Sequence, residues 1–278
     1  MELFTINTEL FKLDGGAMFG VVPKSIWQKI NPADENNMCT WSMRCLLVKE
    51  NNRLVLIDTG IGDKQNEKFF SYYYIHGEDN LKKSLNALGL DFTDITDVFL
   101  THLHFDHCGG AVSFDRIKEK YYPTFPNATY WSHSQHWEWA VKPNAREKAS
   151  FLKENFLPIQ ESGQLKFVDK DHYDLPFDYI DVYGHTEAMI LPLISYKNYK
   201  ILYTADLIPS AGHIPIPYVM AYDVRPLITM HEKENVFKRA LDENWLLYFE
   251  HDHQIEMCSI QNTERGIRMK DKLKLNEI

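Results

Sequence analysis

The chain has 278 residues, of which 44% are hydrophobic and 25% charged, and its formal net charge is −9. This composition is sufficient for a buried core, and we expect a single domain over residues 1–278. The cationic residues form no basic stripe, so a nucleic-acid partner is not expected. No apolar run is long enough to span a membrane, and the N-terminus lacks the pattern of a secretory signal. We therefore expect no membrane partner and a cytoplasmic location.

The four cysteines, Cys39, Cys45, Cys108 and Cys258, form no CxxC pair. Their spacing fits neither a zinc finger nor a disulfide framework, and it indicates free thiols in a reducing compartment. Cys108 directly follows a candidate metal ligand, but we interpret it as a packing residue.

The first half of the chain has the pattern of strands. Alternating or continuous apolar runs predict strands at residues 1–13, 43–48, 54–58 and 98–100. Leu81, Leu85 and Leu88 share one face of a helix, which Gly89 ends. The last of these strands leads directly into Thr101 and His102.

The second half mixes helices and strands. Residues 132–157 predict two helices, because Pro143 interrupts the pattern, with Ser132 and Gln135 as a capping pair. A later helix is expected after Thr229, with Glu232 completing a capping box. Further strands are expected at residues 179–183, 190–196, 201–204 and 246–249. Two clusters of strands, each followed by helices, predict two packed sheets with helices outside, in the α/β or α+β class.

Three histidines and an aspartate lie within six residues, in the segment from His102 to His107. At the end of a strand, His102 and His104 point the same way because side chains alternate. The chain then turns, so that Asp106 and His107 can face a second point in space. Imidazole and carboxylate are ligands of zinc and similar metals. This cluster therefore predicts ligands for two cations a few ångströms apart.

Two metals need more ligands than this cluster supplies, and the remaining candidates follow later strands. His185, Asp206 and His251 each lie where a predicted apolar strand stops. Taken alone, a histidine at a strand end is more often structural than a ligand. Taken in this order after the first cluster, the three residues complete a plausible ligand set.

This series of ligands resembles that of the metallo-β-lactamase superfamily, and the segment Asp58-Thr59-Gly60 matches the supporting strand end of that family. The resemblance covers nearly the whole chain and implies an α+β fold, a four-layer αββα sandwich. It also implies two divalent metal ions, with zinc first and iron, manganese or cobalt as alternatives. In that family arrangement one metal takes His102, His104 and His185, and the other takes Asp106, His107 and His251. Asp206 would bridge them, and Asp58 would orient a ligand histidine from behind.

Two further segments, residues 14–24 and 219–223, resemble the YtnP-like branch of quorum-quenching lactonases. This resemblance implies hydrolysis of N-acyl-homoserine lactones or similar esters, and a homodimer is one expectation from it. Met18 and Phe19 are the expected substrate-binding residues. The aromatic run at residues 69–74 could also contact an acyl chain, although core packing explains it equally well.

The expected reaction is attack of a metal-bridging hydroxide on a lactone or ester carbonyl. Asp106 is the expected proton carrier beside its role as a ligand. Some lactonases of the superfamily carry a tyrosine shortly after the bridging aspartate, but here residues 207–210 contain none. His213 is the candidate that would donate a hydrogen bond to the oxyanion instead. Its alternative interpretation is a loop histidine bonded to a backbone carbonyl.

Two other enzyme classes share this ligand series: thioester hydrolases of the glyoxalase II type, and organophosphate triester hydrolases. The first class adds a C-terminal helical region with basic residues. Here the basic C-terminus, residues 265–274, is short, and we interpret it as a solvated terminal segment. True β-lactamase activity is disfavoured because the best-known enzymes place a cysteine where Asp206 stands. A metal-binding module without enzymatic activity is the remaining alternative, and His104 argues against its flavodiiron form.

Overall fold

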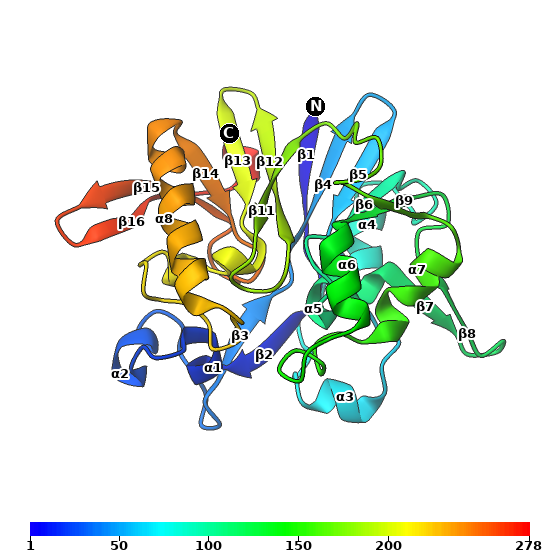
Figure 1. Ribbon diagram of the computed structural model, residues 1–278, viewed down its shortest axis with the longest axis horizontal. Coiled ribbons are helices and arrows are strands. Elements are labelled where there is room, and N and C mark those ends of the chain that lie inside the picture. The colour runs from blue at the N-terminus through cyan, green and yellow to red at the C-terminus, as the bar shows by residue number, and fades with distance from the viewer. The chain divides into compact units, whose positions relative to one another are not determined.

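The computed structural model describes all residues from 1 to 278. The chain divides into two compact units, each with its own six-stranded sheet (Figure 1). The first unit comprises Met1–Glu9 and Met43–Pro176, and the second comprises Leu10–Ser42 and Phe177–Ile278. That residues 1–278 act as one domain stays a prediction.

The sheet of the first unit has the order β1-β4-β5-β6-β9-β10. Its strands are β1 (Glu2–Ile6), β4 (Cys45–Glu50), β5 (Arg53–Ile57), β6 (Asp97–Phe99), β9 (Thr129–Ser132) and β10 (Leu165–Phe167). β1, β4 and β5 pair antiparallel, whereas β5, β6, β9 and β10 run parallel. Residues 45–48 are all buried, as expected for a strand covered on both faces. Because β5 and β6 are parallel, Asp58 and Thr101 follow strand ends at the same edge.

Short helices and one hairpin complete the first unit. These are α3 (Glu67–Ser71), α4 (Leu81–Ala87), α5 (Phe105–Cys108), η1 (Gly109–Ala111), β7 (Val112–Asp115), β8 (Lys120–Pro123), α6 (Ser134–Val141), η2 (Lys153–Asn155) and α7 (Leu157–Glu161). The expected pair of helices between residues 132 and 157 is wrong in its second part, because turns and η2 follow α6. The cap of α6 is also different: His133 accepts the N–H of Gln135, and Ser132 belongs to β9.

The sheet of the second unit has the order β11-β12-β13-β14-β15-β16. Its strands are β11 (Asp178–Val182), β12 (Met189–Tyr196), β13 (Tyr199–Tyr203), β14 (Trp245–Tyr248), β15 (Met257–Thr263) and β16 (Gly266–Leu273). The parallel strands β13 and β14 are joined through α8 (Pro226–Asp242), the long helix of this unit in Figure 1. The basic C-terminus is mostly strand β16, whose lysines are exposed to solvent, and it does not form the helical region of the glyoxalase II type.

The start of α8 also corrects the sequence analysis. The helix begins at Pro226, whose missing N–H is tolerated in the first turn, so Thr229 lies inside the helix. Glu232 does not complete a capping box. Its carboxylate accepts the backbone N–H groups of Tyr183 (2.6 Å) and Gly184 (3.0 Å), just before His185.

Residues 10–42 contribute a hairpin and two short helices to the second unit. The strands β2 (Leu10–Asp14) and β3 (Met38–Ser42) pair antiparallel, and α1 (Gly15–Phe19) and α2 (Lys24–Trp27) lie between them in sequence. Short 3₁₀ turns follow in the same unit at η3 (Ala205–Leu207), η4 (Ala211–His213) and η5 (Leu275–Glu277). None of the helices combines the length and hydrophobicity that crossing a bilayer would require.

Candidate active site

The seven predicted metal ligands divide between the two units. The first unit carries His102 and His104 in the loop after β6, and Asp106 and His107 in α5. All four are buried, with 8% exposure or less. The backbone fixes this segment to the end of β5, because Thr59 N donates to His107 O at 2.8 Å. The order of the chain thus brings four candidate metal ligands together in the loop after β6 and in α5.

The hydrogen bonds of His102 determine which of its nitrogens carries the proton. Thr101 Oγ1 donates to the Asp58 carboxylate at 2.7 Å, so it can only accept from His102 Nδ1, which lies 3.1 Å away. His102 Nε2 therefore presents a lone pair. It faces His104 Nδ1 at 3.1 Å.

The second ring of this pair has a carboxylate beside its outer nitrogen. Glu147 Oε1 lies 3.4 Å from His104 Nε2, which favours a proton on that nitrogen and a lone pair on Nδ1. Two lone pairs then face each other, on His102 Nε2 and His104 Nδ1. Such a pair is repulsive unless a proton or a cation lies between the nitrogens. A metal ion satisfies both.

Asp58 has the contacts of an orienting residue. Its Oδ1 accepts the N–H of Thr101 at 2.8 Å, and its Oδ2 lies 3.2 Å from His107 Nδ1. A carboxylate on Nδ1 leaves His107 Nε2 with its lone pair, on the side of the Asp106 Oδ2 oxygen at 3.9 Å. This geometry is the one expected if Asp58 orients the ring of His107, as predicted.

Glu147 and His136 are contacts of the ligand loop that the sequence analysis missed. The Glu147 carboxylate accepts from Trp139 Nε1 (2.8 Å) and Asn144 Nδ2 (2.5 Å) and is buried beside His104. His136 Nε2 accepts the N–H of Leu103, between the two ligands, at 2.8 Å. Neither residue belongs to a motif, and an acid in a segment expected to be helical gives no signal from sequence alone.

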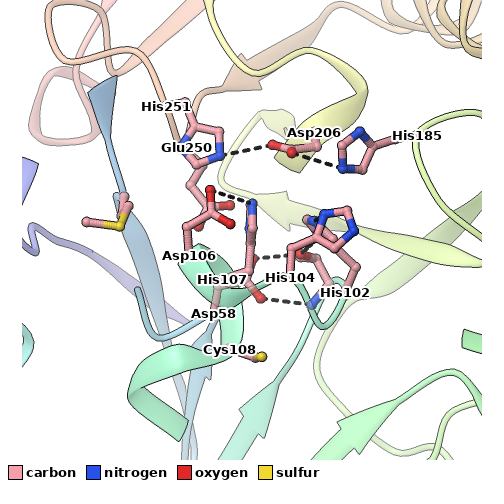
Figure 2. Close-up of polar contacts among 12 residues, drawn as sticks. Asp58, His102, His104, Asp106, His107, Cys108, His185, Asp206, Glu250 and His251 are labelled. Atoms are coloured by element: carbon pink, nitrogen blue, oxygen red, sulfur yellow. Dashed lines mark hydrogen bonds and ion pairs between the residues drawn. The ribbon is translucent and has the colours of Figure 1, made fainter. Parts of the chain in front are cut away.

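In the second unit, Asp206 lies between two imidazoles (Figure 2). Its Oδ2 is 3.1 Å from His185 Nε2, and its Oδ1 is 3.0 Å from His251 Nε2. All three residues follow strands of this unit, as predicted: β11, β13 and β14. The structure therefore brings the three later candidate ligands of the series together.

The other nitrogen of each of these rings faces an acceptor. His185 Nδ1 lies 2.9 Å from Asp223 Oδ1, and His251 Nδ1 donates to the carbonyl of Ser42 at 2.7 Å. Both Nε2 atoms then point at the Asp206 carboxylate, which has only lone pairs to offer. Burial lowers the pKa of His185, but the charges of Asp206 and Asp223 outweigh it and raise the pKa to about 10. A proton or a cation is therefore strongly favoured at this position.

The contacts of His213 differ from those expected of an oxyanion donor, the role predicted for it. Its Nε2 lies 2.9 Å from the Met18 carbonyl and its Nδ1 lies 2.8 Å from Ser210 Oγ, so both nitrogens are engaged. Burial lowers the pKa of His213 to about 3, although the bond to Met18 acts in the opposite direction. These contacts favour the alternative of a structural loop histidine, and the catalytic role stays a prediction.

Met18 and Phe19, the residues predicted to bind substrate, are 1% and 0% exposed. Phe19 stacks between His213, with ring centroids 4.5 Å apart, and Trp27, at 5.6 Å. The side chain of Phe19 is thus engaged in an aromatic stack, and its contact with substrate stays a prediction.

An aromatic cluster in the first unit adjoins the ligand loop. Tyr73 contacts Phe105, which precedes Asp106, at a centroid distance of 4.6 Å, and it contacts Phe69 at 5.0 Å. Burial, together with the negative charge of Asp106, raises the pKa of Tyr73 to about 12. The phenol therefore stays protonated at neutral pH.

Taken separately, each unit presents donors that suit borderline divalent metals. The first offers three imidazoles and a carboxylate, and the second offers a carboxylate between two imidazoles. In each imidazole, an acceptor beside the nitrogen that faces away from the candidate metal position sets the tautomer. This is the usual arrangement for histidine ligands. The donor chemistry therefore fits the metals that the sequence predicts.

Comparison with known proteins agrees with this chemistry. An N-acyl homoserine lactonase from Bacillus sp is 25% identical over 194 residues, which cover 66% of this chain and 69% of that protein. A probable metal-dependent hydrolase from Staphylococcus aureus has a TM-score of 0.86 at 27% identity, with 98% of both chains covered. AidC, a dizinc quorum-quenching lactonase solved with a product, has a TM-score of 0.79 at 22% identity, with 98% and 94% covered. Residues 44–251 match the metallo-beta-lactamase superfamily, and the chain belongs to that family.

Proposed function

We propose that this chain hydrolyses N-acyl-homoserine lactones or similar cyclic esters, using two divalent metal ions. The metal ligands would be the seven residues named from the sequence, with Asp206 shared between the two ions. The order of these residues along the chain follows that of the family, which supports their assignment to one dinuclear centre. Zinc is the first candidate metal, since imidazole and carboxylate suit it.

One observation carries the metal-dependent part of the proposal. Asp206 turns two acceptor oxygens toward His185 Nε2 and His251 Nε2, while the outer nitrogens of both rings already face acceptors. This arrangement needs a positive charge at its centre. The cost of burying such groups without one is high, so a cation at this position would stabilise the arrangement.

When bound, the two cations would supply an activated water at neutral pH and polarise the ester carbonyl. Asp106 is the carboxylate best suited to take the proton of the attacking water and deliver it to the alkoxide oxygen of the opened ring. Asp58 holds the ring of His107 through Nδ1, and Glu147 holds the ring of His104. Rings held in this way would keep the lone pairs of their ligand nitrogens directed at the metal positions while the reaction proceeds.

The aromatic cluster beside the ligand loop supports an apolar substrate. Phe69, Tyr73 and Phe105 contact one another and offer a hydrophobic surface one residue from Asp106. An acyl chain would bury apolar area against these rings. The relatives named as lactonases favour a cyclic ester over a thioester as the bond that is opened.

The proposal is tested by a hydrolysis panel on metal-loaded protein. The substrates are N-acyl-homoserine lactones of several chain lengths, S-lactoylglutathione, an aryl ester and a phosphotriester. We expect the lactones to give the highest kcat/KM, with the ring-opened acid identified by mass spectrometry. His102→Ala should abolish turnover, and His231→Ala should not, because His231 is an exposed histidine on α8.

A clear preference for S-lactoylglutathione or for the phosphotriester would replace the lactonase proposal with that activity. No turnover of any ester by protein that holds two metals would refute it altogether. The cytoplasmic location and the homodimer stay predictions and do not bear on this panel.

A further inference from the structure

Lys233 is a buried cation on the apolar face of α8. It is 0% exposed and lies among Thr229, Val236, Phe237 and Ala240, which form the rest of that face. Its Nζ donates to four backbone carbonyls: His213 (2.6 Å), Pro215 (2.9 Å), Tyr218 (2.9 Å) and Ile216 (3.2 Å). A lysine is rarely fully buried without such partners. The four oxygens form a cage that recognises a compact cation.

The loop of residues 213–218 needs an external donor because of its sequence. Pro215 and Pro217 have no N–H, so the segment cannot pair its own carbonyls as a helix or strand would. Within the loop, Tyr218 N donates to Pro215 O, and Lys233 supplies a donor to the carbonyls of His213, Ile216 and Tyr218 and a second donor to Pro215 O. The ammonium, with its three protons, supplies hydrogen-bond donors in place of the N–H groups that the prolines lack.

Short contacts lead from this cage to a predicted metal ligand. The ring of His213 accepts from Ser210 Oγ, because its Nε2 carries the proton shared with the Met18 carbonyl. On either side of Ser210, Pro209 O accepts the N–H of His251 at 3.1 Å, and Ala211 N donates to Asp252 Oδ2 at 3.0 Å. The loop is thereby tied to the backbone that carries His251.

We propose that Lys233 is a positioning residue, an internal ammonium that takes the place of a bound monovalent cation and fixes the 213–218 loop, and with it residues 206–213 and His251. The inference rests on the proposed function for its effect on turnover, but its structural part does not. Removing the ammonium should loosen the loop and weaken the hold of Asp206 and His251 on metal.

Burial lowers the pKa of Lys233 to about 7, and the charge of Asp223 acts against this. The four carbonyls stabilise the ammonium form and not the free amine. Asp223 also holds His185 Nδ1, so the buried cation lies in the same electrostatic environment as another predicted ligand. This placement is consistent with a role beyond filling space.

The test truncates the side chain and then restores the cation. Lys233→Ala removes the atoms of n-propylammonium, which can be added back, and 1-propanol is a neutral additive of the same size. We expect Lys233→Ala to show faster hydrogen exchange at residues 209–218 and at least a tenfold faster loss of metal to a chelator. Its kcat should fall with little change in KM. Propylammonium should reverse these changes, and propanol should not.

Two further variants keep the result decisive. Lys233→Met preserves the apolar stem without the charge and should reproduce the defects, whereas Val236→Ala, a truncation on the same face of α8, should leave metal retention and loop exchange unchanged. Equal rescue by propanol, or normal metal retention in Lys233→Met, would overturn the proposal. Because exchange and metal loss are measured without any ester, a wrong substrate assignment would leave these results intact. If Lys233→Ala stays unfolded with both additives, Lys233→Met alone decides.

Discussion

At the scale of single residues, the site is defined by which nitrogen of each imidazole carries a proton. His102, His107, His185 and His251 each have Nδ1 facing an oxygen of the protein, which directs Nε2 toward the other candidate ligands. The oxygens come from a hydroxyl, two carboxylates and a backbone carbonyl. A histidine whose outer nitrogen faced solvent would alternate between tautomers and bind metal less well.

Asp106 is the residue at which the proposed roles of metal ligand and proton carrier coincide. Asp106→Asn keeps the size of the side chain and one ligand oxygen but removes the charge. We expect lactone hydrolysis to fall by at least about 100-fold, with metal lost mainly from one of the two positions. Steady-state kinetics and elemental analysis of the same preparation measure both effects. Near-normal turnover in this variant would remove Asp106 from both roles.

The sequence identified the candidate ligands at this scale and one of their supports, Asp58, but not the other supports. The cluster of histidines from His102 to His107 is visible because three imidazoles in six residues follow an apolar strand. Glu147, Asp223 and the Ser42 carbonyl act from other segments, and the carbonyl has no sequence signal at all. Such contacts depend on tertiary packing, which a single sequence does not reveal.

At the scale of elements, the ligand-bearing helix α5 is attached to the loop after β5. Gly110 N donates to Gly60 O at 2.9 Å, and Gly60 and Cys108 form an isolated parallel bridge. A Cβ at Gly110 would lie against the Thr59 carbonyl oxygen, well inside van der Waals contact. Since backbone lies on both sides of this contact, neither segment can rotate away as a side chain would.

Gly110→Ala should therefore separate α5 from the strand end that carries Asp58. We expect a loss of about 2 kcal/mol or more in the free energy of unfolding, with reduced metal content, as measured by chemical denaturation and elemental analysis. Gly163→Ala is the control. Gly163 has a φ of 79° and open space around it, so its substitution should cost only about 1 kcal/mol and leave the metal bound. Equal behaviour of the two variants would contradict this account of the contact.

Strands were easier to predict than helices in this chain. Most predicted strands lie within one or two residues of β4, β5, β6, β11, β12, β13 and β14, because most of these are buried apolar runs, although β11 is only partly buried. The helix starts were less accurate: His133, not Ser132, caps α6, and α8 begins at Pro226 instead of after Thr229. The hairpin of β15 and β16 was missed because its second strand is rich in charged side chains, which face away from the core.

At the scale of the whole molecule, the metal content is the most direct test of the ligand series. Seven ligands with one shared carboxylate imply close to two metal equivalents per chain. Protein purified without chelator should show this ratio by elemental analysis. A fully active preparation that holds a single equivalent would rule out a dinuclear centre.

The family, the α+β fold and the metal-dependent hydrolase class were all predicted from the sequence, and the comparisons confirm them. They could be predicted because the ligands have a fixed order and each follows a strand. The division into two units could not, since the unit to which residues 10–42 belong depends on contacts formed far along the chain.

That division has a consequence for how the protein is made. Residues 10–42 emerge from the ribosome early, but the other part of their unit begins only at Phe177, and the Ser42 carbonyl meets His251 across 209 positions. Phe11, Trp27 and Trp41 are fully or almost fully buried in the folded chain. In the nascent polypeptide they cannot reach this burial until the last third has been translated. During this interval the segment is a natural client for chaperones. The three candidate donors of this unit, His185, Asp206 and His251, can come together only after His251 has been synthesised, so we expect this unit to bind metal late in translation or after it.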